Sequence, residues 1–338
     1  MATEARFYRK LEDDKVRCLL CPHRCLIRPG KRGLCGVREN SGGVLHSLVY
    51  QKAISSHVDP IEKKPFFHFL PGSTSFSVAT VGCNLSCRFC QNSDISQASK
   101  ETDEIDGYDL SPAEVVRQAK ESGCLSISYT YTEPTVFFEY AFDTAVRAKK
   151  EGLANNFVTN GYIEAEPLKA IAPYLDAANV DLKSFREEYY RKICGASLKP
   201  VLDTLILMKE QKLWVEVTTL VLPGQNDSDA ELLDIALFIR DNLGPETPWH
   251  ISRFFPRYRM DASSPTPPET LSRARQIGLD AGLQFVYSGN LAGDSGENTF
   301  CSDCGKTVIG RFGFTLTENK IQGGCCSFCG AKIAGVFR

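Results

Sequence analysis

Short apolar segments alternate with helix-like segments over most of the chain, and this alternation is the strongest constraint on its fold. Seven segments have the length and the β-branched or aromatic content of strands. They are residues 76–81, 124–131, 156–159, 177–182, 214–222, 250–255 and a short 285–287. Helices are expected between them at 111–121, 136–150, 166–172, 200–211, 229–242 and 269–281. Strands and helices that alternate in this way predict an α/β protein with a parallel sheet.

The number of repeats decides between the α/β architectures. Six or so βα units are too few for a closed eight-unit TIM-like barrel, so we predict an open, partial (β/α)6 barrel. We expect three parts: a Cys-rich N-terminal module over residues 1–72, the barrel over 73–295 and a C-terminal module over 296–338. In βα barrels the active-site groups lie at the C-terminal ends of the strands and in the loops after them.

Three cysteines follow the first predicted strand. Cys83, Cys87 and Cys90 stand at C-x3-C-x2-C spacing. A 4Fe–4S cluster in an electron carrier uses four thiolates, one for each iron. Three local thiolates would therefore leave one iron open to a substrate or cofactor. The same three residues also fit a structural zinc site with a distant fourth ligand, or plain buried cysteines of the core.

Polar segments stand at the ends of four successive predicted strands. They are residues 131–134, 159–162, 181–183 and 218–224. Taken singly, each is compatible with an exposed turn or a surface ion pair. Their joint position after the cysteine loop favours one active site at this edge of the sheet.

With these segments, the chain resembles the radical S-adenosylmethionine (SAM) enzymes related to glycyl-radical-enzyme activases, such as those of pyruvate formate-lyase. It is most similar to the branch called the AmmeMemoRadiSam system radical SAM enzyme. The stretches that carry the resemblance, besides the cysteine loop, are CLLCPHRC (18–25), YTYTEP (129–134), VDLK (180–183), TTLVLPG (218–224), WHISRFFP (249–256) and GAKIAGVF (330–337). They span nearly the whole chain.

The resemblance implies a barrel of the radical SAM type and a 4Fe–4S cluster on the three cysteines, with SAM on its open iron. Electrons from a flavodoxin or ferredoxin would cleave SAM reductively, and the resulting 5′-deoxyadenosyl radical would abstract hydrogen from an unidentified substrate. Such an enzyme is of the oxidoreductase type. By the same resemblance, Phe89 packs near the adenine, and the remaining SAM contacts come from Glu133, Asn160, Asp181 and Lys183.

The chain departs from the activases at three points. Tyr131-Thr132 replaces the glycine pair of their Gly-Gly-Glu-Pro motif, and Val158 stands where they often have an acid. Arg253-Phe-Phe-Pro256 replaces a Pro–aromatic–His stretch. A glycyl-radical-enzyme activase, which acts on a large protein partner, is therefore kept as the alternative function.

Two further groups account for eight of the 14 cysteines. Cys301, Cys304, Cys326 and Cys329 form two C-x2-C pairs separated by 21 residues, which predicts a zinc ribbon, with rubredoxin-like iron as the alternative. Cys18, Cys21, Cys25 and Cys35 supply four more ligands, with His23 beside them. Zinc, an auxiliary iron–sulfur cluster and a metal-free site remain open for this group.

The overall charge of the chain is close to neutral. Asp and Glu exceed Lys and Arg by two, so nothing favours a nucleic-acid partner. Residues 15–38 form a local exception, with seven Lys or Arg and no acid. A charged N-terminus and the absence of a long apolar run predict a cytoplasmic protein without a membrane partner. A zinc-binding nucleic-acid or scaffold protein without catalysis is the alternative from a different class.

Overall fold

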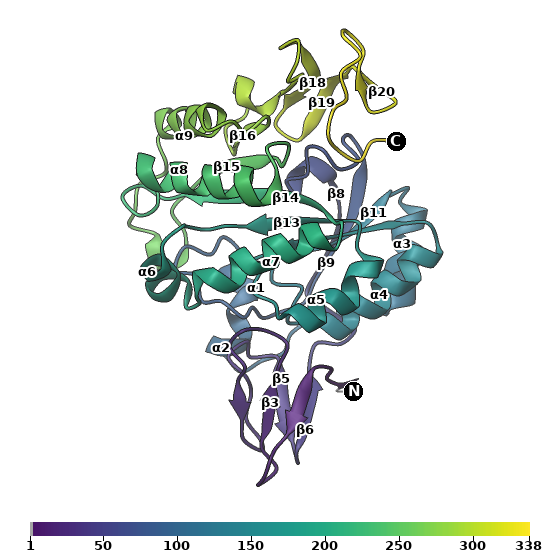
Figure 1. Cartoon of the computed structure of the whole chain (residues 1–338). Helices are drawn as coiled ribbons and strands as arrows, with labels where there is room; N and C mark the ends of the chain where they lie inside the picture. Colours follow the sequence, from purple (N-terminus) through teal and green to yellow (C-terminus); the bar gives the residue numbers. More distant parts are fainter. Residues whose placement is uncertain (1–2) are drawn as a thin grey trace.

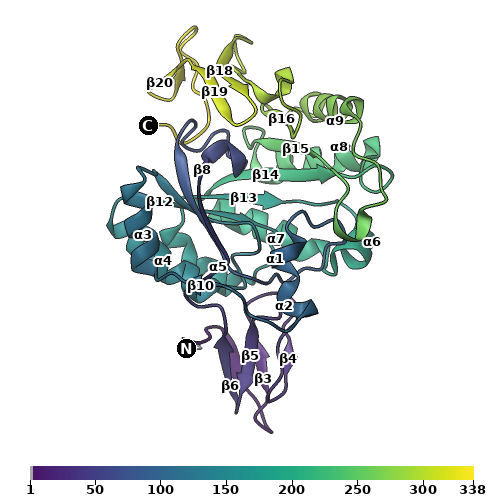
Figure 2. The ribbon, with the colours of Figure 1, turned by 180° about the vertical axis from the view of Figure 1, so that it is seen from behind.

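An eight-stranded sheet organises the computed structural model, which describes residues 3–338 (Figures 1 and 2). In sheet order the strands are β16 (Val286–Gly289), β15 (Trp249–Arg253), β14 (Trp214–Val221), β13 (Ala177–Asp181), β12 (Ala154–Thr159), β11 (Ser126–Tyr129), β9 (Thr74–Ala79) and β8 (Ser55–Pro60). From β9 to β16 all neighbours are parallel, and β8 pairs antiparallel with β9. The seven predicted strands and the α/β class are confirmed.

Helices connect the parallel strands, and several of them cover the front of the sheet in Figure 1. They are α3 (Pro112–Glu121), α4 (Phe138–Lys150), α5 (Ala165–Ile171), α7 (Leu198–Glu210), α8 (Asp229–Phe238) and α9 (Pro268–Asp280). Shorter pieces are α1 (Ser93–Ser96), α2 (Ala98–Glu101) and α6 (Glu187–Tyr189). Helix α3 starts as predicted, because the Ser111 side chain accepts a hydrogen bond from the Glu114 N–H. Helix α8 ends before residue 242, since residues 239–243 continue as a π-helical turn.

Two small antiparallel sheets form an N-terminal module at the lower end of Figure 1. Their strands are β1 (Thr3–Glu4), β6 (Val44–Ser47) and β5 (Arg38–Ser41) in one, and β2 (Tyr8–Lys10), β3 (Val16–Cys18) and β4 (Leu26–Ile27) in the other. A two-stranded pair, β7 (Lys52–Ala53) with β10 (Tyr108–Asp109), lies beyond them in the chain. A buried ion pair joins the module to α4, with Arg38 Nη2 2.7 Å from Glu139 Oε1. Strand β8 precedes the predicted boundary at residue 72 yet extends the main sheet.

A C-terminal β-module lies at the opposite end of the molecule (Figure 1). Its strands are β17 (Thr299–Phe300), β18 (Thr307–Phe312), β19 (Thr315–Asn319), β20 (Ile321–Gln322) and β21 (Cys325–Cys326). His68 joins it to the main sheet: its Nδ1 is 2.6 Å from the Ala334 carbonyl oxygen and its Nε2 2.6 Å from the Tyr287 hydroxyl. Across residues 3–338, no helix has the length and apolar character needed to cross a membrane.

Candidate functional site

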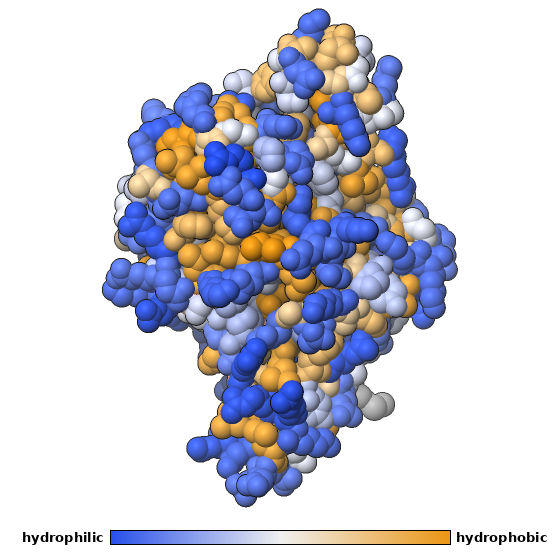
Figure 3. Space-filling view, in the orientation of Figure 1, coloured by the Kyte–Doolittle hydropathy of each residue, from blue (hydrophilic) through white to orange (hydrophobic). Residues whose placement is uncertain are grey.

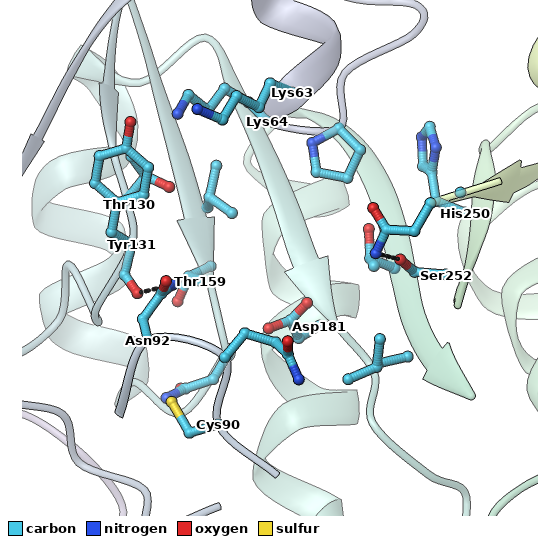
Figure 4. A pocket seen from close by; sticks show the side chains of 18 of the residues that line it. Lys63, Lys64, Cys90, Asn92, Thr130, Tyr131, Thr159, Asp181, His250 and Ser252 are labelled. Atoms are coloured by element: carbon cyan, nitrogen blue, oxygen red, sulfur yellow. Dashed lines mark hydrogen bonds between the residues drawn. The ribbon is translucent and has the colours of Figure 1, made fainter. Parts of the chain in front are cut away.

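A cavity of about 420 Å³ lies at the C-terminal ends of the parallel strands (Figure 4). Seven of the eight residues predicted for the site line it together: Cys83, Cys87, Phe89, Cys90, Asn160, Asp181 and Lys183. These side chains come from the loop after β9 and from the ends of β12 and β13. These side chains converge because neighbouring parallel strands have their C-terminal ends at the same edge of the sheet.

The cysteine loop is held by the backbone of the π-helical turn at residues 190–194. The N–H of Ser86 donates to the carbonyl oxygen of Cys194 at 2.8 Å, and the N–H of Arg88 donates to that of Ile193 at 3.0 Å. Two backbone bonds from a distant segment thus fix the loop between Cys83 and Cys90. Sequence analysis did not connect these segments, since no local pattern links them.

Each of the three thiols has a polar neighbour. The N–H of Leu85 and the side-chain amide of Asn160 approach Cys83 Sγ at 3.4 and 3.6 Å. Cys90 Sγ lies 3.1 Å from the Ser96 hydroxyl. Burial raises the pKa of the Cys83 and Cys90 thiols, and a hydrogen bond with Cys194 followed by burial raises that of Cys87. With their pKa values raised, these thiols lose their protons when a metal ion binds the sulfur.

Three thiols border one cavity, which is a donor set that a multi-iron cluster can use. Within residues 3–338, one group of cysteines has all its sulfurs within 4.8 Å of one another, as a single ion requires, and that group is at the C-terminus. Cys83, Cys87 and Cys90 border one cavity without being so close together. A four-iron cluster binds each thiolate to a different iron and holds them further apart than one ion does. The donor set therefore fits such a cluster.

Lys183 and Asp181 bring charge to the cavity. Lys183 Nζ lies 2.8 Å from Asp181 Oδ2 and 5.8 Å from the centre of the Phe89 ring. Although burial opposes its charge, the Asp181 carboxylate holds the pKa of Lys183 well above its usual value. A partly buried cation at the wall of a cavity is suited to bind a carboxylate.

Glu133 is fully buried and is not among the residues that line this cavity. Its Oε1 accepts hydrogen bonds from the Thr135 N–H and hydroxyl and from the Thr159 hydroxyl, at 2.9, 2.6 and 2.8 Å. Its Oε2 accepts one from the Asn160 N–H at 2.8 Å. Burial raises its pKa, although these donors act against the shift. Glu133 thus fixes Thr159 and Asn160, and its predicted contact with SAM stays a prediction.

The cavity has a cationic wall that sequence analysis missed. Lys63 and Lys64 line it (Figure 4). Their Nζ atoms lie 2.8 and 2.7 Å from the two oxygens of Asp59. Tyr131, which has a φ of 64°, donates its hydroxyl to the same carboxylate and receives Lys64 over its ring at 4.2 Å. The adjacent lysines were the only signal in the sequence. Their position depends on β8, a strand that was not predicted.

The C-terminal cysteines form a compact four-sulfur group. Cys301 and Cys329 have their sulfurs 3.6 Å apart, and Cys304 and Cys326 have theirs 3.8 Å apart. Four thiolates at about 2.3 Å from one tetrahedral ion would lie about 3.8 Å from one another. Gly305 adopts a φ of 70° in the turn after the first pair, a conformation that favours glycine. The group can bind a metal ion, and Cys325 lies outside it.

The N-terminal cysteines Cys18, Cys21, Cys25 and Cys35 also come together. All four line a second, small cavity of about 20 Å³. His23 and Arg38 line it as well. Within each of the three cysteine groups that the sequence indicated, the structure therefore brings the members together.

Comparisons with known proteins agree with this geometry. The family model described as "Radical SAM superfamily" matches residues 77–236. The chain is 48% identical over 332 residues to the Methanocaldococcus jannaschii protein named "Uncharacterized protein MJ0808", covering 98% of each chain. It is 26% identical over 212 residues to "Putative glycyl-radical enzyme activating enzyme MJ1632" of that organism, covering 61% of this chain and 78% of the other.

One solved structure has a similar fold over most of the length of this chain. The crystal structure of a radical SAM methyltransferase from Sphaerobacter thermophilus matches with a TM-score of 0.52 and 16% sequence identity. The match covers 88% of this chain and 80% of that one. At this level of identity the likeness concerns the α/β fold alone.

Proposed function

The chain belongs to the radical SAM superfamily, and from this premise we propose that Cys83, Cys87 and Cys90 hold a 4Fe–4S cluster beside a SAM site in the 420 Å³ cavity. The observation that carries the proposal is the convergence of three spaced thiols, a partly buried lysine and a strand-end amide on that cavity. When bound, these cofactors supply reductive cleavage of SAM and a 5′-deoxyadenosyl radical that abstracts hydrogen from a substrate.

The proposal gives a role to each predicted residue of the site. Lys183 binds the methionine carboxylate of SAM, and Asp181 both orients that lysine at 2.8 Å and accepts hydrogen bonds from hydroxyls. Phe89, which is buried, packs near the adenine. Glu133 acts as a positioning residue through Thr159 and Asn160. The partial barrel we propose for the sheet surrounds these groups and excludes water from them.

For the substrate we propose a protein, as in glycyl-radical-enzyme activation. The relative named as a putative activating enzyme favours this class. The cavity wall also reaches the C-terminal module at Glu297, Gly313 and Phe314, so a substrate would meet both parts of the chain.

A flavodoxin or ferredoxin would supply the electrons. We place the chain in the AmmeMemoRadiSam branch, with structural zinc at the C-terminal cysteines. The non-catalytic alternative is not retained, because the superfamily is one of enzymes.

Product formation tests the proposal. The anaerobically reconstituted protein, given SAM and dithionite, is expected to release 5′-deoxyadenosine, which chromatography with mass spectrometry quantifies. Cys90→Ala is expected to release none, whereas Cys124→Ala, a buried cysteine outside the three groups, is expected to match the wild-type chain. Failure of a fully iron-loaded wild-type protein to cleave SAM would overturn the proposal.

A further inference from the structure

The N-terminal cavity has the ligands of a metal site. Its wall contains four cysteines from different turns of one small module: Cys18 at the end of β3, Cys21 and Cys25 before β4, and Cys35 before β5. Cys18 and Cys35 are buried, and Cys21 and Cys25 are partly exposed. The strands of this module are only two to four residues long. Four thiols in one of its cavities are the ligands of a metal centre.

The sulfurs of the N-terminal cysteines are not gathered as closely as those at the C-terminus. Within residues 3–338, the four C-terminal cysteines have all their sulfurs within 4.8 Å of one another, and the N-terminal four are not such a group. Among the described residues, Cys83, Cys87 and Cys90 do not form such a compact group either. A four-iron cluster binds each thiolate to a different iron, so its four sulfurs do not have to lie so close together.

A buried cation with a spare donor supports an anionic occupant. Arg38 lines the cavity and is 1% exposed. Its two terminal nitrogens bind Glu139, while its Nε has no hydrogen-bond partner among the described residues. Buried donors without a partner are rare, and four thiolates around a cluster carry surplus negative charge that an N–H group can stabilise.

The N-terminal cavity lies directly against the loop of the first cluster site. His23 Nε2, between Cys21 and Cys25 in sequence, is 2.8 Å from the carbonyl oxygen of Asn84, the residue after Cys83. Gly82, the residue before Cys83, is packed so closely that a β-carbon there would lie 3.1 Å from the Cys35 carbonyl oxygen and 2.6 Å from Val37. The backbone segments that carry the two ligand sets are therefore in contact.

We infer that Cys18, Cys21, Cys25 and Cys35 bind a second 4Fe–4S cluster, which passes electrons to the site at Cys83, Cys87 and Cys90. One electron leaves a reduced carrier of the flavodoxin or ferredoxin class and reduces the second cluster. The same electron then moves to the first site and leaves the second cluster oxidised, without proton transfer. The second cluster itself is independent of the proposed function, whereas its electron acceptor rests on it.

The surface around the second site suits an acidic carrier. Leu26 and Leu34, each next to a cysteine of the group, are 52% and 62% exposed. Arg17, Arg28 and Lys31 are exposed on the same module. An apolar centre bordered by positive charge matches an electron carrier with a negative docking face. Figure 3 shows apolar side chains among hydrophilic ones at this end of the molecule.

Iron content tests the second cluster without any assay of activity. After anaerobic reconstitution, a variant with Cys83, Cys87 and Cys90 all changed to Ala is expected to keep about four iron and four sulfide per chain. Its reduced paramagnetic resonance signal should not respond to SAM, and adding Cys21→Ala and Cys25→Ala should remove both iron and signal. Zinc at this site, or no iron, would overturn the inference.

The wild-type chain gives a second measurement in case that variant does not fold. About eight iron per chain is expected for two clusters, and about four would overturn the inference. Cys124→Ala serves as the control and should keep the wild-type content. If the proposed function failed, the wild-type signal would not respond to SAM, yet the iron count of the second site would stand.

Reduction kinetics test the transfer of electrons. In Cys21→Ser/Cys25→Ser, reduction of the first cluster by reduced flavodoxin should slow at least about tenfold. Reduction by titanium(III) citrate, a small reductant that needs no docking surface, should keep its wild-type rate. Rapid-freeze paramagnetic resonance follows both reactions. Equal rates with flavodoxin in the variant and the wild-type chain would disprove the transfer.

Discussion

The side-chain amide of Asn160 lies 3.6 Å from the sulfur of Cys83 and 2.8 Å from the side-chain oxygen of Asn84. The end of β12 is thereby tied to the loop after β9, although 77 positions separate Asn160 from Cys83. The backbone N–H of Asn160 is held by Glu133, so the carboxylate controls where the amide points. This relationship joins the strand-end segments to the cysteine loop in one site.

Loss of the Asn160 amide is expected to make the first cluster harder to reduce. A hydrogen bond to a cysteine sulfur stabilises the more negative, reduced state, so Asn160→Ala should lower the midpoint potential by about 40 mV, on the scale where 59 mV is a tenfold change for one electron. A redox titration followed by paramagnetic resonance measures the shift. Asn156→Ala, on β12 but outside the cavity wall, is the control. A raised or unchanged potential in Asn160→Ala would contradict the assigned role.

Lys183→Met is expected to weaken SAM binding about tenfold or more, because a partly buried charge-assisted contact with a carboxylate is lost. Titration of the reduced protein with SAM, followed through its paramagnetic signal, gives the affinity. Lys169→Met removes an exposed lysine of α5 and should leave the affinity unchanged. Wild-type affinity in Lys183→Met, with the cluster intact, would exclude Lys183 from the SAM site.

Cys329→Ser is expected to remove about one zinc per chain and to lower the free energy of unfolding by roughly 3 kcal/mol or more, since metal binding contributes to folding. Metal analysis and thermal unfolding measure the two effects. Cys325→Ser, which changes a cysteine outside the four-sulfur group, is the matched control. Retention of zinc in Cys329→Ser would mean that another set of ligands holds it.

Stability is expected to fall in mild acid through His68. The Ala334 carbonyl can only accept a hydrogen bond, so Nδ1 carries the proton and Nε2 accepts from Tyr287. Burial lowers the pKa of His68 to about 4. The unfolded chain, with a histidine pKa near 6.5, therefore binds more protons between these values, and stability is lost as the pH falls below about 6.5.

Comparison with a variant that lacks His68 measures how much stability this histidine contributes at each pH. Between pH 7.5 and pH 5.5 the His68 contribution to the free energy of unfolding should fall by about 1 kcal/mol. The difference between the wild-type chain and His68→Gln isolates it, because all other titrating groups are common to both. Denaturant unfolding at the two pH values gives that difference. A difference that is constant with pH would show that His68 does not stay neutral in the fold.

The sequence predicted the parts of the fold and site that local patterns determine. Cys83, Cys87 and Cys90 were found by spacing, and Asn160, Asp181 and Lys183 by their positions at predicted strand ends. The N-terminal strands were missed, because strands of two to four residues carry too little periodicity to detect. Strand β8 was missed, and with it the place of Lys63 and Lys64 in the cavity wall. The burial of Glu133 depends on Thr135, Thr159 and Asn160 meeting in space, which no local pattern reports.

Paramagnetic resonance of the anaerobically reconstituted, dithionite-reduced protein, recorded with and without SAM, tests the central claim most directly. The account predicts a reduced 4Fe–4S signal whose shape changes when SAM is added, because the open iron gains a ligand. In Cys87→Ala the SAM-dependent part should disappear, while the signal of the second cluster remains. A wild-type signal that is indifferent to SAM would contradict the claim that Cys83, Cys87 and Cys90 hold a cluster with an open iron.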